Sequence, residues 1–388
     1  MELTKGQQFA LETFLSGENI LLLGDPGTGK SALISTIIEA AESDGKIVAI
    51  TASTGIAAQL IGGRTIHSFL RAFPGMAIKK INYESKIDNL SKIDVLIIDE
   101  ISMLGCKFIE YLYNCLKHVQ HHIQLVLVGD FFQLPPVKDG YAFKSLSWQL
   151  LRLVPCVLTE VVRQNDAEFV RNINLLKNGD PSCLDYLISH SSPVPLMGQI
   201  SICATRSDAQ LINNIEMEKL SGTPQLYSAE HEGTVFESEL RTEECLVIKN
   251  GMRVMSVINS SRYSNGSLGT VIDHDSSSVN VLFDNGNDVK LGKELFTVDR
   301  KDIIGETTVL KQIPLRPAYA ITIHKSQGQT FQNVNIDGTR CWAPGQLYVA
   351  VSRARSIEGI HFLTPIRNGN IKTDPAVARY YQSIGFSE

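Results

Sequence analysis

Short apolar runs alternate with longer segments of helical periodicity through the first half of the chain. The runs are mostly aliphatic and lack the alternation of polar and apolar positions that marks a strand with one face in water. Apolar strands separated by helices predict a parallel sheet covered on both faces, whose ligands bind at the carboxyl ends of the strands. The expected strands are 20–23, 47–51, 95–98, 124–128 and 156–158.

The second half of the chain restarts the same α/β pattern. A strand is expected at 200–203 and a helix at 209–220, which Asp208 is placed to cap. From Pro317 the pattern resumes after an interruption. The later expected elements are strands at 333–336 and 359–363, a helix opened by Pro344 that holds 347–354, and a terminal helix capped by Asp374 and Pro375.

Two segments interrupt the α/β pattern and define the predicted domains. A basic segment at about 70–92 looks like a small insertion. Between 243 and 308, short strands at 254–257, 270–272 and 279–283 alternate with Asn-Gly turns and predict a small antiparallel, barrel-like insertion. We therefore predict an α/β protein with a first domain at 1–168, which carries the first insertion, and a second at 169–388, which carries the other.

The composition indicates a globular chain of two or three domains, since it has 388 residues, of which 43% are apolar and 20% charged. No apolar run is long enough to cross a bilayer, and the charged segment 1–14 is not a secretory signal. We expect a cytoplasmic protein, or a nuclear one if the source is eukaryotic. The seven cysteines form no C-x-x-C pair, so reduced thiols are expected. The net charge of −5 gives no overall support for a nucleic-acid partner, although a local basic groove would suffice.

The segment 24–31, Gly-Asp-Pro-Gly-Thr-Gly-Lys-Ser, lies between an expected strand and an expected helix and is called the phosphate loop below. Glycines allow main-chain N–H groups to curl closely around phosphates, and the following helix directs its positive dipole end toward them. Lys30 is expected to reach the outer phosphates and the Ser31 hydroxyl to hold Mg²⁺. This pattern predicts a nucleotide site without saying what hydrolysis serves.

Acidic and amide side chains follow two of the expected strands. Asp99 and Glu100 end the run 95–98, where a carboxylate would contact Mg²⁺ and its neighbour would orient or deprotonate the attacking water. Gln133 follows the strand 124–128 and is placed to hydrogen-bond a γ-phosphate or its water. The alternative for the Gln133 segment is a rigid loop, because Pro135 and Pro136 fix the backbone.

Two arginines and three hydroxyl-rich segments complete the candidate chemistry. Arg163 and Arg353 present donors that suit a transferring phosphoryl group, although either alone would more often be a solvated surface residue. The segments 51–55, 63–69 and 323–328 combine hydroxyls, glycines and a histidine. Such groups can hold nucleic-acid phosphates and bases, and each could equally serve as a helix cap.

Taken together, these segments resemble the superfamily 1B DNA helicases, most closely the PIF-type branch that is akin to RecD and Dda. The resemblance implies two tandem RecA-like domains with ATP in the cleft between them. It also implies a strand-separating wedge at the first insertion and an SH3-like subdomain at the second. The motifs in family order are S-T-G-I-A-A and G-G-R-T-I-H-S-F within 51–69, I-D-E-I-S-M-L at 98–104, G-D-F-F-Q-L-P-P-V at 129–137, H-K-S-Q-G-Q-T at 324–330 and V-A-V-S-R-A-R at 349–355.

The resemblance assigns roles to individual residues, with Gln7 where the family reads adenine and Arg353 contributed by the second domain. The catalytic residues it implies are Lys30, Asp99, Glu100, Gln133, Arg163 and Arg353. The nucleotide contacts are Gln7, Gly24, Pro26, Gly27, Thr28, Gly29, Lys30, Ser31, Gln133, Arg163, Gly328 and Arg353, with Ser31 and Asp99 on Mg²⁺. The DNA contacts are Thr54, Gly55, His67, Ser68, Phe69, Pro135, His324, Lys325 and Ser326.

The motifs and the resemblance together predict an ATP- and Mg²⁺-dependent helicase that acts on DNA in replication, recombination or repair. The resemblance implies that it moves 5′ to 3′ on single-stranded DNA and unwinds duplex. Expected partners are single-stranded and tailed duplex DNA and single-strand-binding or replisome proteins, with no membrane and a monomeric chain. Two alternatives stay open: a translocase that displaces proteins or remodels forks with little unwinding, and a nucleotide-switched DNA-binding module. The size of the chain suits a phage or bacterial member of the family.

Overall fold

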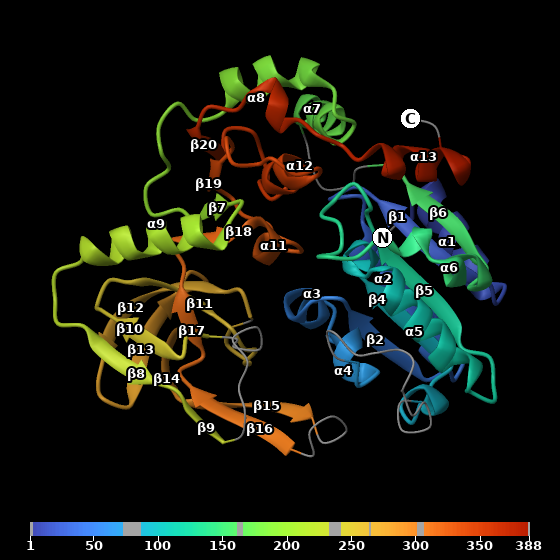
Figure 1. Ribbon diagram of the computed structural model, residues 1–388, viewed down its shortest axis with the longest axis horizontal. Helices are drawn as coiled ribbons and strands as arrows, with labels where there is room; N and C mark the ends of the chain where they lie inside the picture. Colours follow the sequence, from blue (N-terminus) through green and yellow to red (C-terminus); the bar gives the residue numbers. More distant parts are fainter. Residues whose placement is uncertain are drawn as a thin grey trace. The chain divides into compact units, whose positions relative to one another are not determined.

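The computed structural model describes residues 3–72, 87–160, 166–232, 242–263, 265–300 and 306–386. The chain forms two compact units (Figure 1). The first joins Met1–Pro195 with Ser326–Glu388, and the second is Leu196–Lys325. These units differ from the predicted domains because the C-terminal segment belongs with the N-terminal one; the domain boundary near residue 168 stays a prediction.

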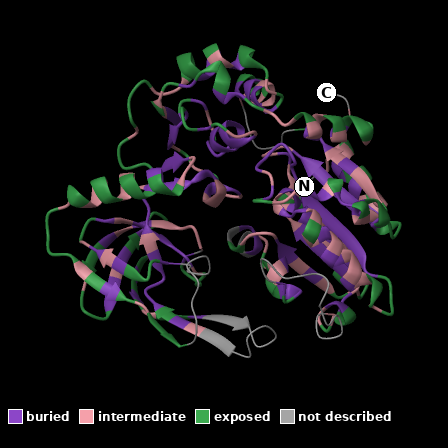
Figure 2. Cartoon of the chain, in the orientation of Figure 1, coloured by how far each residue is buried: buried purple, intermediate pink, exposed green. Residues whose placement is uncertain are grey.

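The first unit is built on a six-stranded sheet in which every strand pair is parallel, with the order β3-β2-β4-β5-β1-β6. Ile20 and Leu22 pack with helices α1 and α2 on one face, while the alternating Leu21 and Leu23 are buried on the other. Both faces are therefore covered, as the apolar runs predict (Figure 2). The strands are β1 (Asn19–Gly24), β2 (Val48–Ala52), β3 (Arg64–Thr65), β4 (Val95–Asp99), β5 (Gln124–Gly129) and β6 (Leu153–Leu158).

Helices connect these strands, and each begins or ends where the sequence offers a suitable residue. Thr4 and Gln7 form a reciprocal capping box at the start of α1, and Thr65 caps α4. His118 lies at the end of α5, where a basic residue is favourable. The helices are α1 (Lys5–Leu15), α2 (Lys30–Ser43), α3 (Gly55–Leu60), α4 (Ile66–Phe69), α5 (Cys106–Lys117) and α6 (Leu146–Leu150), with 3₁₀ turns at Leu90–Lys92, Ile101–Met103 and Ala142–Lys144.

The remainder of the first unit contains the parallel pair β19 (Val334–Asp337) and β20 (Ile360–Thr364), which confirms two predicted strands. The terminal helix α13 (Pro375–Ser383) is capped by Asp374 with proline at its first position, as predicted. Helix α12 (Gln346–Val351) is shorter than predicted, since Gly345 precedes it and Ser352 ends it. The other elements are α7 (Ala167–Lys177), α8 (Leu184–His190) and 3₁₀ turns at Pro181–Cys183 and Asn368–Asn370.

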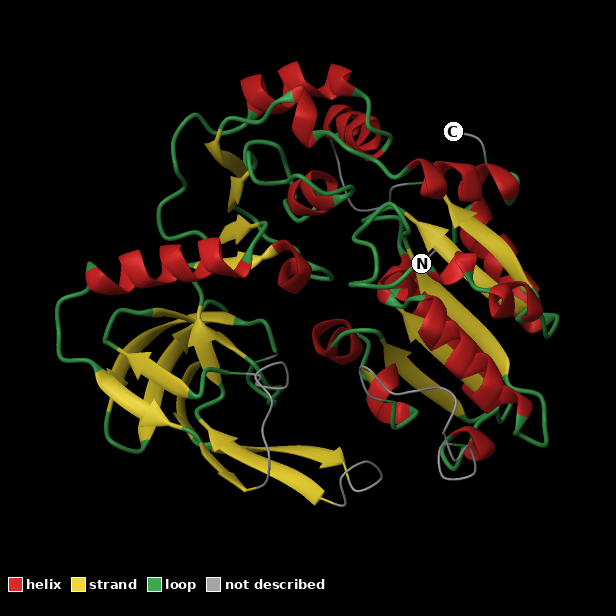
Figure 3. Cartoon of the chain, in the orientation of Figure 1, coloured by secondary structure: helices red, strands yellow, loops and turns green. Residues whose placement is uncertain are grey.

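The second unit consists largely of antiparallel strands (Figure 3). Its five-stranded sheet has the order β14-β13-β12-β11-β17 around a core that includes Val254, Val281 and Phe283. Strands lie on both sides of the predicted range 243–308. They are β8 (Gln225–Ser228), β9 (Glu230–Glu232), β10 (Cys245–Ile248), β11 (Arg253–Ser256), β12 (Leu268–His274), β13 (Ser278–Phe283), β14 (Asp288–Gly292), β15 (Glu294–Arg300), β16 (Glu306–Gln312) and β17 (Leu315–Pro317).

The second unit also holds a small α/β part, in which β7 (Ser201–Cys203) pairs in parallel with β18 (Ala320–Thr322). Helix α9 (Arg206–Glu218) follows β7, and α11 (Ile323–Ser326) follows β18. The predicted cap of α9 is wrong: Thr205 is the cap, and its hydroxyl oxygen accepts the Asp208 N–H. Asp208 instead accepts a hydrogen bond from Thr205, so the helix begins three residues earlier than expected.

Two predicted features fall outside the described residues. Positions 73–86, most of the insertion expected at about 70–92, are not described, and neither is Arg163. Among the described residues, no helix combines the length and the apolar character that a membrane crossing requires.

Candidate active site and DNA-contacting segments

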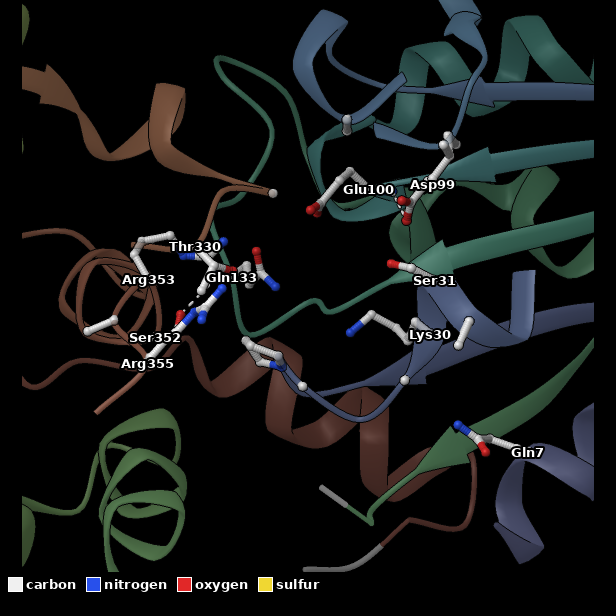
Figure 4. A pocket seen from close by; sticks show the side chains of 18 of the residues that line it. Gln7, Lys30, Ser31, Asp99, Glu100, Gln133, Thr330, Ser352, Arg353 and Arg355 are labelled. Carbon is white, nitrogen blue, oxygen red and sulfur yellow. Dashed lines mark hydrogen bonds between the residues drawn. The ribbon is translucent and has the colours of Figure 1, made fainter. Parts of the chain in front are cut away.

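A cavity of about 630 Å³ lies in the first unit at the carboxyl ends of β1, β4 and β5 (Figure 4). Figure 4 shows Lys30, Ser31 and Asp99 directed toward it from the phosphate loop and from β4. The C-terminal segment contributes Arg353 to the same lining. The predicted residues that line the cavity are Gln7, Pro26, Gly27, Gly29, Lys30, Ser31, Asp99, Glu100, Gln133, Gly328 and Arg353.

The phosphate loop has the backbone that its glycines predict. Gly27 and Gly29 have φ angles of 87° and 81°, a left-handed conformation that favours glycine. Gly29 precedes α2 without a side-chain cap, so the first N–H groups of a 14-residue helix face the loop side. The Lys30 ammonium donates to the carbonyls of Gly24 and Asp25 at 2.6 and 2.9 Å. Main-chain donors, a helix dipole and an ammonium group thus meet at one place, as phosphate binding requires.

Gly24 and Thr28, both predicted nucleotide contacts, lie outside the cavity lining. Thr28 is 1% exposed, and its hydroxyl donates to the Asp25 carbonyl at 2.8 Å. A Cβ at Gly24 would lie 2.7 Å from the Thr28 hydroxyl and 3.0 Å from the Leu158 carbonyl. Glycine at position 24 therefore serves the packing of β1 against β6, and the loop glycines that line the cavity are Gly27 and Gly29.

Gln7 lines the cavity and is fixed at both ends of its amide. Its Nε2 donates to the Thr28 carbonyl at 3.3 Å, and its Oε1 accepts the Thr4 N–H at 3.0 Å. The side chain is 5% exposed. Gln7 thus links the start of α1 to the phosphate loop, which places it beside a nucleotide bound there.

Asp99 and Glu100 form the acidic wall of the cavity. Glu100 has a left-handed backbone with φ 53° and ψ 46°, which is costly for a residue with a side chain and is found mainly at functional sites. Its N–H donates to the Asp99 carboxylate at 2.8 Å. The buried Glu100 Oε2 has no hydrogen-bond partner among the described residues. Burial and the neighbouring Asp99 charge raise the pKa of Glu100 to about 7, against the opposing effects of Arg353 and Lys30.

Arg353 reaches the cavity from the end of α12. Its guanidinium donates to the carbonyls of Val349 and Gln329 at 3.0 and 3.2 Å and to the Ser352 hydroxyl at 3.0 Å. The residue is 4% exposed, and burial lowers its pKa while Glu100 opposes that shift. The side chain is therefore held by its own helix and directed at the acidic wall. Arg355 also lines the cavity and was not among the predicted site residues, although it stands in the motif 349–355.

A buried ion pair between Lys177 and Asp25 of the phosphate loop was not predicted from the sequence. The Lys177 ammonium contacts both Asp25 carboxylate oxygens, at 3.1 and 3.0 Å, with the Lys177 side chain 3% exposed. It also lies 5.1 Å from the centroid of the Phe132 ring. Lys177 ends an ordinary amphipathic helix, so nothing in the sequence distinguishes it. Asp130 and Tyr348 belong to the same region, since Lys177 and Asp25 both act on the pKa of Asp130 and the Tyr348 hydroxyl donates to it.

The predicted DNA contacts of the first unit are of two kinds. Gly55 and Ser68 are exposed, whereas the Thr54 hydroxyl accepts the Ala57 N–H at 3.2 Å and thereby caps α3. Phe69 is 2% exposed, with the Arg64 guanidinium carbon 4.6 Å from its ring centroid. Its ring is a core side chain and cannot stack on a base in this conformation. That part of the prediction is not supported.

Three further predicted DNA contacts of this unit differ in accessibility. The His67 ring lies 4.7 Å from the Phe108 ring, and burial lowers its pKa. Pro135 is half-buried, and Ser326 is fully buried. These three residues stay predicted contacts, with Ser326 placed to shape the backbone rather than to offer its hydroxyl to a ligand.

In the second unit, basic side chains gather where two parallel strands end. Cys203 of β7 pairs with Thr322 of β18, so Arg206 and His324, which follow those ends, lie on the same edge. Burial, then the charges of Arg316 and Arg206, lowers the pKa of Lys325 to about 8. Glu243 is the acidic group that opposes this shift. Arg206 and Arg316 were not predicted, because a single arginine in a helix or strand carries no signal of its neighbours.

The fold and the cavity define a P-loop nucleoside triphosphatase of the helicase type. Family models agree, since the AAA domain matches residues 2–192 and the UvrD-like helicase C-terminal domain matches residues 317–356. ATP-dependent DNA helicase Pif1 of Bdellovibrio bacteriovorus is 31% identical over 99% of this chain and 92% of that protein. ATP-dependent DNA helicase PIF1 of Homo sapiens is also 31% identical over 99% of this chain, which spans 64% of the human protein.

Solved structures give the same result across the whole fold. The Pif1 helicase from Candida albicans has a TM-score of 0.85 at 30% identity, covering 99% of this chain and 100% of that one. Bacteroides Pif1 bound to single-stranded DNA has a TM-score of 0.79 at 30% identity, covering 99% and 97%. The chain belongs to the Pif1 family of ATP-dependent DNA helicases. The predicted fold class, with two RecA-like domains, is thereby confirmed, as is ATP hydrolysis.

Proposed function

We propose that this chain moves 5′ to 3′ along single-stranded DNA at the expense of ATP and separates duplex ahead of it. The observation that carries the proposal is the cavity of the first unit. It brings together the phosphate loop, the guanidinium of Arg353 and the buried carboxyl group of Glu100, whose Oε2 has no hydrogen-bond partner in the described part of the chain. A protein that only switched its DNA affinity on nucleotide binding would need neither a base nor a charge-stabilising arginine.

Each cavity residue has a distinct part in hydrolysis. The phosphate loop and Lys30 bind the phosphates, Glu100 takes a proton from the attacking water, and Arg353 stabilises charge on the transferring group. The carboxylate of Asp99 and the exposed hydroxyl of Ser31 supply the oxygen ligands that Mg²⁺ prefers, so the donor set fits that ion. Mg²⁺ bound there would neutralise phosphate charge.

The DNA side of the proposal rests on local charge. The overall charge is −5, yet basic groups lie close together in the second unit: the charge of Arg206 acts on both His324 and Lys325, and that of Arg316 on Lys325. Clustered cations with one acidic neighbour suit a phosphodiester backbone and carry no base preference. Exposed Gly55 and Ser68 offer small polar contacts of the same kind in the first unit. DNA is also the ligand named for solved relatives, one with single-stranded DNA and one with forked duplex.

The biological setting is proposed on family membership alone. We propose roles in DNA replication, recombination or repair, a monomeric working form, and contacts with single-strand-binding or replisome proteins. A cytoplasmic location, or a nuclear one in a eukaryotic source, belongs to the same proposal.

Strand separation on tailed duplexes tests the function and its polarity. The purified chain, with ATP and Mg²⁺, is given duplexes that carry either a 5′ or a 3′ single-stranded tail, and both ATP hydrolysis and product strands are measured. We expect DNA-stimulated hydrolysis on both substrates and separation of the 5′-tailed duplex alone. Lys30→Ala should abolish hydrolysis, while Lys46→Ala, a partly exposed lysine outside the cavity lining, should not.

The other outcomes point to the alternatives. Stimulated hydrolysis without strand separation would indicate a translocase that displaces proteins or remodels forks. DNA binding that changes with nucleotide while hydrolysis stays unstimulated would indicate a switched binding module. Separation of the 3′-tailed duplex alone would overturn the proposed polarity.

A further inference from the structure

Asp130 is a buried carboxylate that connects two parts of the cavity wall without lining the cavity itself. It follows β5 directly and is 1% exposed. Its Oδ1 accepts the Phe132 N–H at 2.9 Å. Its Oδ2 accepts from the Tyr348 hydroxyl at 2.8 Å and, over a longer distance of 3.4 Å, from the Gln133 amide nitrogen. One oxygen atom thus holds a residue of the β5 loop and a residue 218 positions later.

The Tyr348 end of this connection leads to Arg353. Tyr348 lies on α12 and is 2% exposed. Arg353 follows the same helix, and its Nε donates to the Val349 carbonyl at 3.0 Å. Because the guanidinium is bonded to its own helix, its position is set by the position of α12.

The Gln133 end leads to the same helix by a second route. Gly345 immediately precedes α12 with a φ of 76°, and a Cβ there would lie 2.7 Å from the Phe132 carbonyl and 2.8 Å from the Gln133 carbonyl. The backbone of α12 therefore packs directly on the loop that carries Gln133. The Gln327 amide also donates to Gln133 Oε1, at 3.5 Å. Helix α12 is thus held against this loop at Gly345, just before its first residue, and again at Tyr348.

The surroundings of Asp130 disfavour its charge on balance, but nearby cations and the Tyr348 hydroxyl limit the effect. Burial, then the charge of Asp25, raises the pKa of Asp130 to about 6, while Lys30, Lys177 and the Tyr348 hydroxyl oppose the shift. The carboxylate is therefore ionised at pH 7.5. Tyr381 also faces it, and burial and Asp130 hold the pKa of the Tyr381 phenol well above its usual range, as they do for Tyr348. An ionised acceptor and a neutral phenol make a strong hydrogen bond.

We propose that Asp130 and Tyr348 are positioning residues that hold Gln133 and Arg353 in one hydrogen-bonded assembly, so that both groups meet the γ-phosphate together. The inference deepens the proposed function and rests on ATP hydrolysis in this cavity. Among the described residues, the Lys30 ammonium is hydrogen-bonded to loop carbonyls and not to Asp130 or Tyr348, and Lys30 acts on Asp130 only through its charge. ATP binding should therefore depend on the pair far less than turnover does.

Tyr348→Phe removes the hydroxyl and leaves the ring. We expect DNA-stimulated kcat to fall roughly 10- to 100-fold, as for small misplacements of catalytic groups, with KM for ATP changed by less than about threefold. Tyr227→Phe is the matched control. Tyr227 is also 2% exposed, its hydroxyl donates to the carbonyls of Asp275 and Ser278, and it lies in the second unit. The kcat of Tyr227→Phe should stay at the level of the unaltered chain, while its loss of thermal stability should be similar to that of Tyr348→Phe.

A double-mutant cycle separates positioning from a merely structural role. If Tyr348 acts through Arg353, then Tyr348→Phe should lower kcat by less than about twofold in an Arg353→Ala background. A full additional loss in that background would overturn the inference. Asp130→Asn is the second variant: it should also lower kcat, and the Asp130→Asn/Tyr348→Phe pair should lose no more than the worse single variant.

Failure of the positioning role can be distinguished from failure of the proposed function. If the unaltered chain hydrolyses ATP and Tyr348→Phe keeps its kcat, or loses no more than Tyr227→Phe, the positioning role is overturned alone. If the unaltered chain does not hydrolyse ATP with DNA, the proposed function falls and the inference with it.

Discussion

Glu100 carries the clearest chemical signal of any single side chain in the first unit. Its backbone is left-handed, one carboxyl oxygen is buried without a hydrogen-bond partner among the described residues, and its pKa lies at about 7. A structural carboxyl group would be expected to have partners and a lower pKa. A general base works best when its pKa lies near the working pH, so each of these unfavourable features suits proton abstraction from water.

The pKa of Glu100 gives a pH dependence of the rate. As a base, Glu100 must be ionised, so kcat/KM for ATP should fall about tenfold for each pH unit below about 7. The measurement is DNA-stimulated hydrolysis from pH 5.5 to 8.5 at constant ionic strength. Glu100→Gln should abolish turnover while ATP and DNA still bind. Loss of both bindings in that variant would indicate a structural role instead.

The same side chain predicts a pH dependence of stability. The folded-state pKa is about 7 and the unfolded value is 4.5, so the folded protein binds the extra proton between them. Stability from this group is therefore present below pH 4.5 and is lost as pH rises through 7. Glu100→Gln has no carboxyl group to ionise, so this fall in stability at high pH should disappear. The melting temperature of the variant should therefore exceed that of the unaltered chain by more at pH 8 than at pH 5. An equal difference at both values would contradict the raised pKa.

At the scale of elements, the sequence predicted what depends on local pattern. The aliphatic runs identified β1, β4 and β5, because strands buried on both faces need apolar residues at every position. Caps were harder. Thr205 and Asp208 are both good caps, and which one begins α9 depends on where β7 ends. Helix α12 ends early at Ser352, and its sequence gives no reason for this.

Hydrogen bonds between distant elements could not be read from the sequence at all. From the sequence pattern, Tyr348 is expected to be one of the apolar residues of a buried helix. Only the fold brings its hydroxyl to Asp130. Phe69 is the opposite case: it stands among polar residues and was assigned to DNA, yet it fills the core. Motifs identified the cavity residues because phosphate chemistry demands fixed residue types, whereas packing accepts many.

A substitution at Gly345 tests how strongly turnover depends on the position of α12. Gly345→Ala strains a left-handed backbone, which costs about 1–2 kcal/mol, and places a Cβ against two carbonyls of the Gln133 loop. Gly286 is the matched control, with a φ of 87° and nothing within 4 Å of the added Cβ. Both variants should lose thermal stability, but only Gly345→Ala should lose kcat, by roughly tenfold or more. Equal activities would mean that the seating of α12 does not govern turnover.

At the scale of the whole molecule, the nucleotide cavity lies in the first unit, while predicted DNA contacts occur in both. That residues 326–388 join the N-terminal segment in one unit could not be predicted from local patterns, since it depends on long-range contacts. The sequence did predict that the phosphate loop and Arg353 share a site, because the family resemblance carries that arrangement. Because Arg353 lines the nucleotide cavity, we expect its contacts to change when a nucleotide binds. Such a change can couple nucleotide binding to DNA binding.

That coupling can be measured as a free energy without reference to any path through the protein. If a non-hydrolysable ATP analogue changes the affinity for a single-stranded oligonucleotide by some factor, DNA must change the affinity for the analogue by the same factor. We expect a factor of about 5 to 150 in both titrations, and a factor nearer one in Arg353→Ala, whose phosphate loop is intact. Tyr227→Phe should keep the full factor. A factor of one in the unaltered chain would mean that occupancy of the phosphate loop is not felt at the DNA, and a motor driven by this cavity would be excluded.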